Sequence, residues 1–206
     1  NKRYSASDDP ERWHRFQEYN FGQMAELRNR YTPDLWWFDG DWEHSAEEWR
    51  ADEIRGVLLE KKPSTIINSR LRGRGDYATP ENGPPVFKPH HDYWELCLTT
   101  NDNWGYVPND LNYKSPQQVI DIFVDCISKG GNLLLDIGPK ADGTIPVEQI
   151  NILTELGTWT GKHEESIYGI EAGVSYEHFH GPSALSPDST TLYLYAASAE
   201  EKRNWM

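Results

Sequence analysis

The sequence predicts an α/β fold in which parallel strands alternate with helices. Strand-like and helix-like segments follow one another along most of the 206 residues, as in a sheet with crossover connections. Residues 132–137 form a nearly unbroken apolar run, which is typical of a parallel strand covered on both faces. The length suffices for one domain with its own core, or for part of a larger one.

The expected helices are marked by their start and stop residues. Asp8-Asp9-Pro10 opens the first helix, and Thr32-Pro33 ends it. Ser45-Ala46-Glu47-Glu48 and Ser115-Pro116-Gln117-Gln118 are capping boxes, in which a serine and a residue three positions later cap each other's amides. Gly130-Gly131 ends the helix that the second box begins.

Between these signals the pattern assigns each remaining element. The expected order is helix 10–30, strand 35–38, helix 46–62, strand 64–69, strand 93–99, helix 116–129, strand 132–137, helix 146–162 and strand 191–196. The side of the first helix that we expect to be apolar carries Trp13, Phe16, Tyr19, Met24 and Leu27. Residues 70–89 form a long Gly/Pro-rich loop, and such loops are usually functional.

Composition limits the kinds of partner. The net charge is −13, and the only dense basic cluster is Arg70-Leu71-Arg72-Gly73-Arg74, so we expect no nucleic acid. No apolar run is long enough to span a membrane. No signal peptide is recognisable, and the chain starts at Asn1 close to its first helix, which suggests a piece that begins in mid-domain. A neutral ligand such as a sugar would not be repelled.

Neither a cofactor nor a metal is expected. No dinucleotide-type glycine fingerprint or phosphate loop occurs, because Gly130-Gly131 ends a helix instead of starting one. In His90-His91-Asp92 the adjacent histidines would point to opposite faces of a strand, so they cannot easily share one ion. Cys97 and Cys126 each lie in an apolar segment and are expected to be small buried thiols.

One short run, Leu35-Trp36-Trp37-Phe38-Asp39-Gly40-Asp41, points to carbohydrate chemistry. In parallel α/β proteins the carboxyl end of a strand faces the active-site crevice, which is where Asp39 would lie. The aromatic rings before it offer flat apolar faces to a sugar. The alternative is that Asp39 only caps the turn before Gly40, and that most of the nine Trp and eleven Tyr belong to the core.

Glycoside hydrolysis needs two carboxyl groups, which in retaining enzymes lie about 5–5.5 Å apart. Asp39 is the candidate nucleophile, because a short side chain at a strand end is rigid. Glu81, in the long loop, and Glu95, on an apolar strand, are both candidates for the acid/base. Burial would raise the pKa of Glu95, as suits a general acid, but a buried Glu95 that pairs with an arginine is the alternative.

Three further residues are candidates for sugar binding. Trp37 lies two positions before Asp39. Arg70 follows a strand end, where its guanidinium could hold a sugar hydroxyl or orient the nucleophile. Trp104 lies just beyond another strand end and could pack on an apolar sugar edge.

Taken together, these segments resemble the α-L-fucosidases of glycoside hydrolase family 29. The matching stretches are Leu35-Trp36-Trp37-Phe38-Asp39-Gly40, Ile67-Asn68-Ser69-Arg70, Gly75-Asp76-Tyr77-Ala78-Thr79-Pro80-Glu81, Trp94-Glu95, Asn103-Trp104-Gly105-Tyr106, Ser128-Lys129-Gly130-Gly131-Asn132-Leu133-Leu134-Leu135-Asp136-Ile137-Gly138-Pro139 and Asp142-Gly143-Thr144-Ile145-Pro146. Each stretch is weak alone, but their order and spacing over residues 10–198 are specific.

The resemblance implies a (β/α)8-type, TIM-like barrel followed by a β-sandwich. The whole chain, 1–206, would be the C-terminal portion of the barrel, with a strand at about 190–198 beginning the β-region. It also implies release of terminal α-L-fucose from fucosylated glycans with retention of configuration. The family's nucleophile falls on Asp39, its sugar-contacting residues on Trp37, Arg70 and Trp104, and its acid/base on Glu81 or Glu95, with Glu81 ranked first.

The resemblance has one serious departure. Family members carry upstream barrel strands that supply further sugar-binding residues, and this chain has no room for them. We therefore expect either a fragment of a larger enzyme or a chain that completes its barrel by self-association, because an incomplete barrel exposes a strand edge. A non-catalytic sugar-binding remnant is the second functional class. Family members are often secreted, periplasmic or lysosomal, and this sequence does not fix its compartment.

Overall fold

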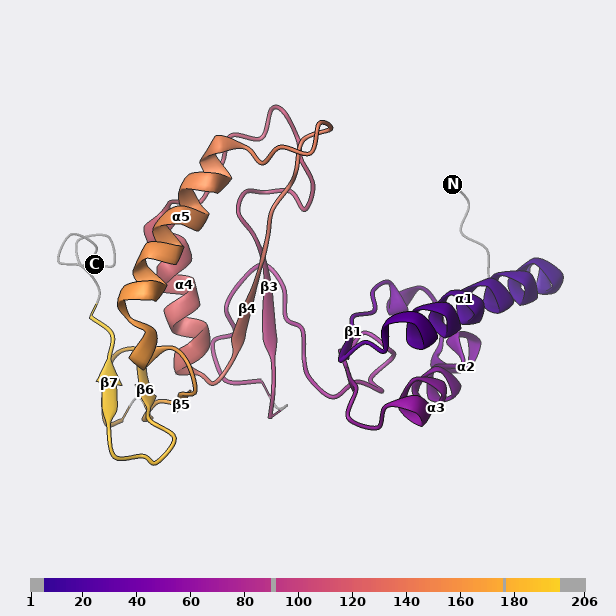
Figure 1. The fold of residues 1–206 in the computed structure, drawn as a ribbon, viewed down its shortest axis with the longest axis horizontal. Coiled ribbons are helices and arrows are strands. Elements are labelled where there is room, and N and C mark those ends of the chain that lie inside the picture. Colours follow the sequence, from indigo (N-terminus) through magenta and orange to yellow (C-terminus); the bar gives the residue numbers. More distant parts are fainter. Residues whose placement is uncertain (1–5, 90–91, 176, 197–206) are drawn as a thin grey trace. The chain divides into compact units, whose positions relative to one another are not determined.

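A computed structural model describes residues 6–89, 92–175 and 177–196. The chain divides into two compact units, an N-terminal unit of residues 1–79 and a C-terminal unit of residues 80–206 (Figure 1). Each unit combines helices with a pair of parallel strands. The α/β class and the parallel pairing predicted from the sequence are therefore confirmed, while the assignment of residues 1–206 to one domain stays a prediction.

The N-terminal unit pairs two short strands beside three α-helices. Its elements are α1 (Pro10–Tyr31), β1 (Leu35–Trp36), the 3-10 helix η1 (Asp41–Glu43), α2 (Ala46–Trp49), α3 (Ala51–Lys61) and β2 (Ile66–Ile67). β1 and β2 are parallel, with Trp36 opposite Ile67. Both strands are shorter than expected, because the side chain of Asn68, and not a strand main chain, makes the next hydrogen bonds to Phe38. Its Oδ1 accepts from the Phe38 N–H at 2.9 Å, and its Nδ2 donates to the Phe38 carbonyl at 2.8 Å.

The helix boundaries follow the capping signals, with one correction. Asp9 caps α1 by accepting from the Arg12 N–H at 2.9 Å, and Thr32 ends the helix in the left-handed conformation. The capping box at Ser45 forms as expected. The single helix expected over 46–62 is wrong, because Arg50 adopts φ 55° and separates α2 from α3. There the Arg50 guanidinium packs on the Phe21 ring and pairs with Glu53, contacts that the helix pattern does not reveal.

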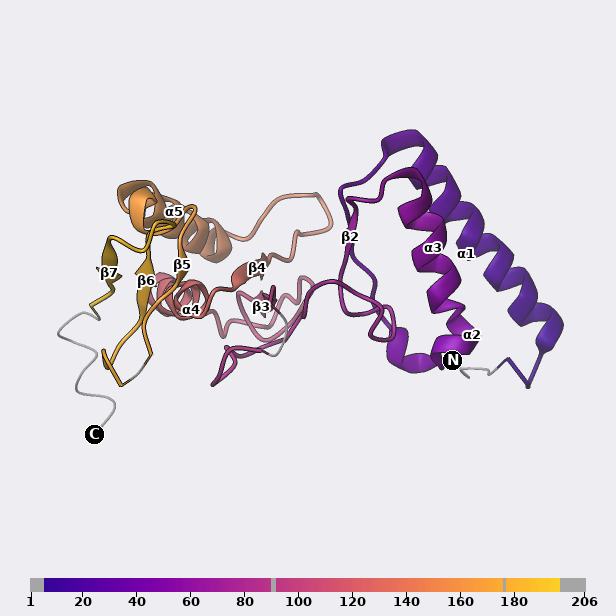
Figure 2. The same cartoon turned by 90° about the horizontal axis from the view of Figure 1, so that it is seen from below.

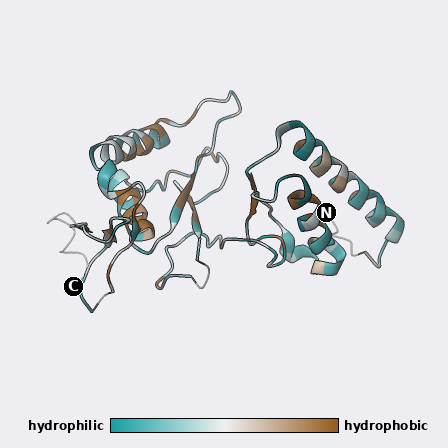
Figure 3. Ribbon diagram, turned by 60° about the horizontal axis from the view of Figure 1, so that its bottom comes forward, coloured by the Kyte–Doolittle hydropathy of each residue, from teal (hydrophilic) through white to brown (hydrophobic). Residues whose placement is uncertain are grey.

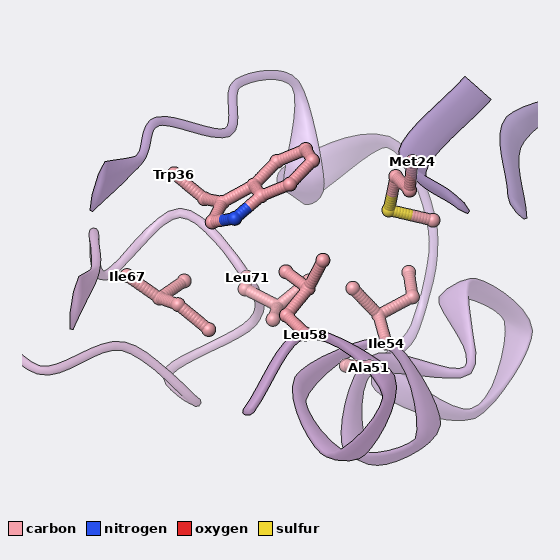
Figure 4. Close-up of a cluster of buried hydrophobic side chains, with 7 residues drawn as sticks. All are labelled: Met24, Trp36, Ala51, Ile54, Leu58, Ile67 and Leu71. Carbon is pink, nitrogen blue, oxygen red and sulfur yellow. The ribbon is translucent and has the colours of Figure 1, made fainter. Parts of the chain in front are cut away.

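The core of the N-terminal unit lies where α1 and α3 meet the two strands (Figure 4). Its buried members are Met24, Trp36, Ala51, Ile54, Leu58, Ile67 and Leu71. The expected apolar side of α1 is only partly right, because Tyr19 and Leu27 are exposed while Gln17 is buried. Gln17 and Met24 lie seven positions apart, two helical turns along one face. The buried Gln17 amide donates to the Glu48 carbonyl.

The C-terminal unit is built around a longer parallel pair. Its elements are β3 (Glu95–Thr99), α4 (Pro116–Ser128), β4 (Asn132–Asp136), α5 (Val147–Lys162), the 3-10 helix η2 (Glu164–Ser166), β5 (Glu171–Ala172), β6 (Ser183–Leu185) and β7 (Leu192–Leu194). β3 and β4 run in register from Glu95 opposite Asn132 to Thr99 opposite Asp136. The second capping box forms at Ser115.

Helices α4 and α5 lie side by side on one side of the β3–β4 pair (Figure 2). Leu96 and Leu98, on one face of β3, are fully buried. Since side chains alternate along a strand, Glu95, Cys97 and Thr99 share the other face with their β4 partners. We call this second face the open face after its exposed part on β4, where Leu134 is 42 % exposed, whereas Cys97 and Thr99 on β3 are buried. The expectation that residues 132–137 are covered on both faces is therefore wrong for the part of the chain that the structure describes.

The last part of the C-terminal unit is a three-stranded antiparallel sheet in the order β5-β6-β7. The sequence predicted only one strand here, over residues 191–196. β5 and β6 were missed because runs of two or three residues carry no readable alternation. Hydrophobic segments mark β3, β4 and much of α4 in Figure 3, whereas most of α1 is hydrophilic, so α1 was predicted from its start and stop residues and not from its hydrophobicity.

Cys97 and Cys126 are both buried, as the sequence predicted. Burial raises the pKa of the Cys126 thiol to about 12, so this thiol stays protonated and unreactive at neutral pH. No helix in the described ranges is long and apolar enough to cross a membrane. His90 and His91 lie outside the described residues, so the expectation about a metal there stays a prediction.

Candidate active site

Asp39 lies on a backbone that is fixed just before it. β1 ends at Trp36, and the Asn68 amide then holds both polar groups of the Phe38 peptide. The Asp39 side chain itself is 58 % exposed. A rigid main chain therefore presents an accessible carboxylate beyond the carboxyl end of a parallel strand.

Arg70 lies beyond the end of β2 and binds this carboxylate. Its Nη1 donates to Asp39 Oδ1 at 2.8 Å, and its side chain is only 10 % exposed. The other side of the guanidinium is held by Thr79, which accepts from Nε at 2.9 Å and from Nη2 at 3.2 Å. The planar group also lies 4.6 Å from the Trp37 ring centre, within the range of a cation–π contact.

The carboxylates of Asp39 and Asp41 both contact the segment that follows β2. Gly40 has φ 77°, and Asp41 Oδ2 accepts from the Arg72 N–H at 2.7 Å. The bond recorded for the Asp39 carboxylate goes to Arg70 instead. Within the described residues, the Asp39 carboxylate therefore binds the Arg70 side chain, and the Asp41 carboxylate binds the main chain at Arg72.

A pocket of about 190 Å³ adjoins this group. Its lining consists of Phe16, Asn20, Phe38, Asp39, Asp41, Trp49, Ile54, Arg70 and Leu71. Aromatic rings, two carboxylates and a guanidinium in a small concave space suit a polar ligand with an apolar edge. The volume lies below the roughly 300–1,000 Å³ of drug-sized ligand sites, so the pocket suits a small ligand.

Glu81 occupies a strand-like position beside β3. The Cys97 N–H donates to the Pro80 carbonyl, and the Asn82 N–H donates to the Cys97 carbonyl, both at 2.9 Å. This parallel bridge places Glu81 opposite Cys97. Because partners in a parallel ladder point to the same face, Glu81 belongs to the open face.

Glu95 is the first residue of β3 and is half-buried. It shares the open face with Cys97 but lies at the amino end of the strand. Glu81, level with Cys97, is nearer to the carboxyl end by two residues, or about 7 Å at roughly 3.3 Å per residue. Active-site residues in parallel barrels gather at the carboxyl ends, which favours Glu81 over Glu95.

Trp104 lies in the loop that follows β3 and is half-exposed. Asp110 organises this loop by accepting from the Asp102 N–H at 3.1 Å and from Asn103 Nδ2 at 2.7 Å. Asn112 Nδ2 closes the loop onto Asp102 at 2.9 Å. The loop thus presents the indole from an ordered backbone.

Gln149, near the start of α5, is a positioning residue that the sequence interpretation missed. Its Nε2 donates to Thr100 Oγ1 at 2.8 Å, and its Oε1 accepts from the Gly138 N–H at 3.0 Å. It therefore ties the loop after β3 to the loop after β4, and it is almost completely buried. An amide in the first turn of an amphipathic helix was the available signal, but it does not by itself name its partners.

Each unit thus contains three of the six candidate residues. The N-terminal unit brings Trp37, Asp39 and Arg70 into one cluster. The C-terminal unit places Glu81 and Glu95 on the open face and Trp104 in the loop after β3. The roles of the six residues remain predictions.

A glycosidase active site uses carboxyl groups for catalysis and aromatic rings to bind the sugar. The candidate residues supply both kinds of group, together with a guanidinium. The family model described as alpha-L-fucosidase matches residues 1–165. The chain belongs to the α-L-fucosidase family, as the motifs predicted.

Known relatives agree with this assignment. The alpha-L-fucosidase of Dictyostelium discoideum is 32 % identical over 158 residues, which are 71 % of this chain and 34 % of that protein. The chain thus spans about a third of the length of the curated relatives that it matches.

Solved structures extend the similarity to the fold. Isoenzyme 1 from Paenibacillus thiaminolyticus is 34 % identical, with a TM-score of 0.78 over 84 % of this chain and 45 % of that one. A GH29 enzyme from Bacteroides thetaiotaomicron is 27 % identical, with a TM-score of 0.81 over 96 % of this chain and 51 % of that one. These fucosidases have a TIM-barrel catalytic domain. The similarity covers about half of the length of each of these two solved chains. The described residues themselves form small sheets and no closed barrel.

Proposed function

We propose that this chain carries catalytic groups of a retaining α-L-fucosidase that releases terminal fucose from fucosylated oligosaccharides or glycoconjugates. The observation that carries the proposal is the Asp39–Arg70 pair: an exposed strand-end carboxylate, with one oxygen held at 2.8 Å by a buried guanidinium beside Trp37. Family membership supplies the substrate class.

The chemistry divides between two carboxyl groups. Asp39 attacks the anomeric carbon of fucose, the bond from that carbon to the leaving oxygen breaks, and Glu81 or Glu95 donates a proton to that oxygen. The same glutamate, now ionised, removes a proton from water. That water attacks the anomeric carbon, the Asp39 ester bond breaks, and fucose leaves with its configuration retained.

Arg70 has a defined part in this sequence. Its hydrogen bond to Asp39 Oδ1 fixes the plane of the carboxylate, and Asp39 Oδ2 accepts no hydrogen bond from the residues that the structure describes. Oδ2 is therefore the attacking atom in this proposal. A structure of the related Bacteroides thetaiotaomicron enzyme shows a trapped covalent intermediate in complex with 2-fluoro-fucosyl fluoride. This observation on the relative supports a covalent mechanism here.

The test is Asp39→Gly with Asp34→Gly as the matched control, because Asp34 is exposed just before β1. Asp39→Gly should abolish hydrolysis of an aryl α-L-fucoside, and added azide should restore part of it as an external nucleophile. Asp34→Gly should keep its activity. Mass spectrometry of the native chain with 2-fluoro-fucosyl fluoride should locate the adduct on Asp39. An adduct elsewhere, or an active Asp39→Gly variant, would refute the assignment.

A second candidate is a sugar-binding chain that turns over only when another chain or a second copy completes its site. The observation that favours it is the short parallel pairs, on which Leu35, Ile66 and Leu134 are exposed. Sedimentation at tens of micromolar (roughly the range in which exposed edges associate) beside the fucoside assay distinguishes the two. Fucose binding without turnover would support this candidate, and a stable monomer would count against self-association.

A further inference from the structure

Asp136 is a carboxylic acid at the carboxyl end of β4 that has no role in the proposed reaction. It is the last residue of the strand and lies opposite Thr99, the last residue of β3. Through this register it belongs to the open face, together with Glu95 and Cys97. Strand ends of this kind are where parallel α/β enzymes place residues that touch substrate.

The Asp136 carboxyl group is only partly accessible, and no hydrogen bond or ion pair to it from the described residues is recorded. Burial raises its pKa. Asp110 in the neighbouring loop shows the opposite behaviour, because the hydrogen bond from Asn103 lowers its pKa. A desolvated carboxyl group without internal donors costs free energy, and groups of this kind cluster at functional sites.

The loop that carries Trp104 comes close to this strand end. A Cβ atom on Gly138, two residues after Asp136, would lie 2.7 Å from the Tyr106 nitrogen and 2.8 Å from the Gly105 carbonyl carbon. Only glycine allows the two loops to approach so closely. Gln149 joins the same two loops, because it binds Thr100 in the loop after β3 and Gly138 in the loop after β4. The segment after β4 and the Trp104 loop thus lie against each other.

We propose that Asp136 is a further substrate-binding residue, whose carboxyl group accepts a hydrogen bond from a sugar hydroxyl next to Trp104. The inference rests on the proposed function, since it assumes a fucoside as the ligand. An aromatic face for the apolar edge of a sugar and a carboxylate for its hydroxyl groups are complementary parts of one subsite. A bound hydroxyl supplies a donor that the described residues do not provide.

The experiment compares Asp136→Asn with Asp142→Asn, which makes the same change in the exposed turn after β4. Calorimetry measures the Kd for L-fucose, and kinetics on an aryl α-L-fucoside give KM and kcat. A hydrogen bond to a charged group is worth about 10- to 100-fold in binding. Asp136→Asn should therefore raise Kd and KM by roughly tenfold or more and change kcat much less, whereas Asp142→Asn should match the native chain.

Stability towards urea separates this role from a structural one. Removing a desolvated carboxyl group that binds none of the described residues should leave the urea midpoint of Asp136→Ala unchanged or higher. A lower midpoint together with unchanged fucose binding in Asp136→Asn would overturn the proposal, and so would native-like Kd and KM. A native chain that neither binds nor hydrolyses fucosides would overturn the proposed function and the inference about Asp136 with it, whereas an active native chain with native-like Kd and KM in Asp136→Asn would overturn the inference alone.

Discussion

Asp39 and Arg70 lie three residues beyond Trp36 and Ile67, which face each other in the parallel ladder. Equal distances past paired positions bring the two side chains level at the carboxyl ends of β1 and β2, where Arg70 Nη1 donates to Asp39 Oδ1 at 2.8 Å. Thr79 holds the remaining edge of the guanidinium. The orientation of the candidate nucleophile therefore depends on strand register and on a loop residue forty positions away in the sequence.

Replacing Arg70 by lysine should lower kcat/KM for an aryl α-L-fucoside by roughly 10- to 100-fold. A lysine ammonium can bind Asp39 or Thr79 but cannot reproduce the planar set of three hydrogen bonds, and a hydrogen bond to a charged group contributes about 1.5–3 kcal/mol. Arg72→Lys is the matched control, because that side chain is exposed two positions later. Equal activities of the two variants would contradict the role given to Arg70.

Glu81 should prove to be the acid/base, because it lies nearer than Glu95 to the carboxyl end of β3. Glu81→Ala should slow fucosides with poor leaving groups far more than activated ones, since only poor leaving groups need protonation. Glu95→Ala should affect both substrates alike. The reverse pattern would transfer the role to Glu95, and no difference in either variant would place the acid on another segment.

Gln149→Leu should raise KM for the fucoside more than it changes kcat, because it releases the Trp104 loop from the loop after β4. It should also destabilise the chain by about 1–3 kcal/mol per polar group left buried without a partner, here Thr100 Oγ1 and the Gly138 N–H. Gln149→Glu keeps the acceptor for the Gly138 N–H. Its KM and its free energy of unfolding should lie between those of the native chain and of Gln149→Leu. Gln117→Leu on the exposed side of α4 is the control and should change little. Urea unfolding and steady-state kinetics check both effects.

Asp76 should make the stability of the N-terminal unit depend on acid pH. Burial alone would raise its pKa, but hydrogen bonds from Arg55 and from the Ile67 N–H outweigh burial and lower it below 3.8. The folded pKa is thus below the unfolded one, so the contribution is complete above about pH 3.8 and is lost as pH falls through the folded value. Asp76→Asn should cost about 1 kcal/mol at neutral pH after solvent screening.

The urea midpoints of the native chain and of Asp76→Asn should converge as the pH falls below about 3.8, because the Asp76 carboxylate becomes protonated. Asp92→Asn, a change at an exposed position, serves as the control and should follow the native chain at every pH. A constant gap between the native chain and Asp76→Asn down to strongly acid pH would show that the carboxylate charge does not contribute.

Features fixed by neighbouring residues could be predicted from the sequence. The capping boxes at Ser45 and Ser115 form as expected because both partners lie within four residues. Asp39 and Arg70 could be named as candidates because each follows a recognisable apolar strand segment. Family membership was also readable, since the order of the motifs survives without any knowledge of contacts.

Features that depend on distant partners required the tertiary structure. The break at Arg50, the exchange of ladder hydrogen bonds with the Asn68 side chain and the bridge that aligns Glu81 with Cys97 each join segments that local patterns treat as independent. The roles given to Gln149 and Asp136 follow only from their contacts, strand register and burial. The sequence by itself determined which elements and chemical groups are available, because propensity and capping act over a few residues. Packing decided which groups meet, because burial and strand pairing depend on residues tens of positions apart.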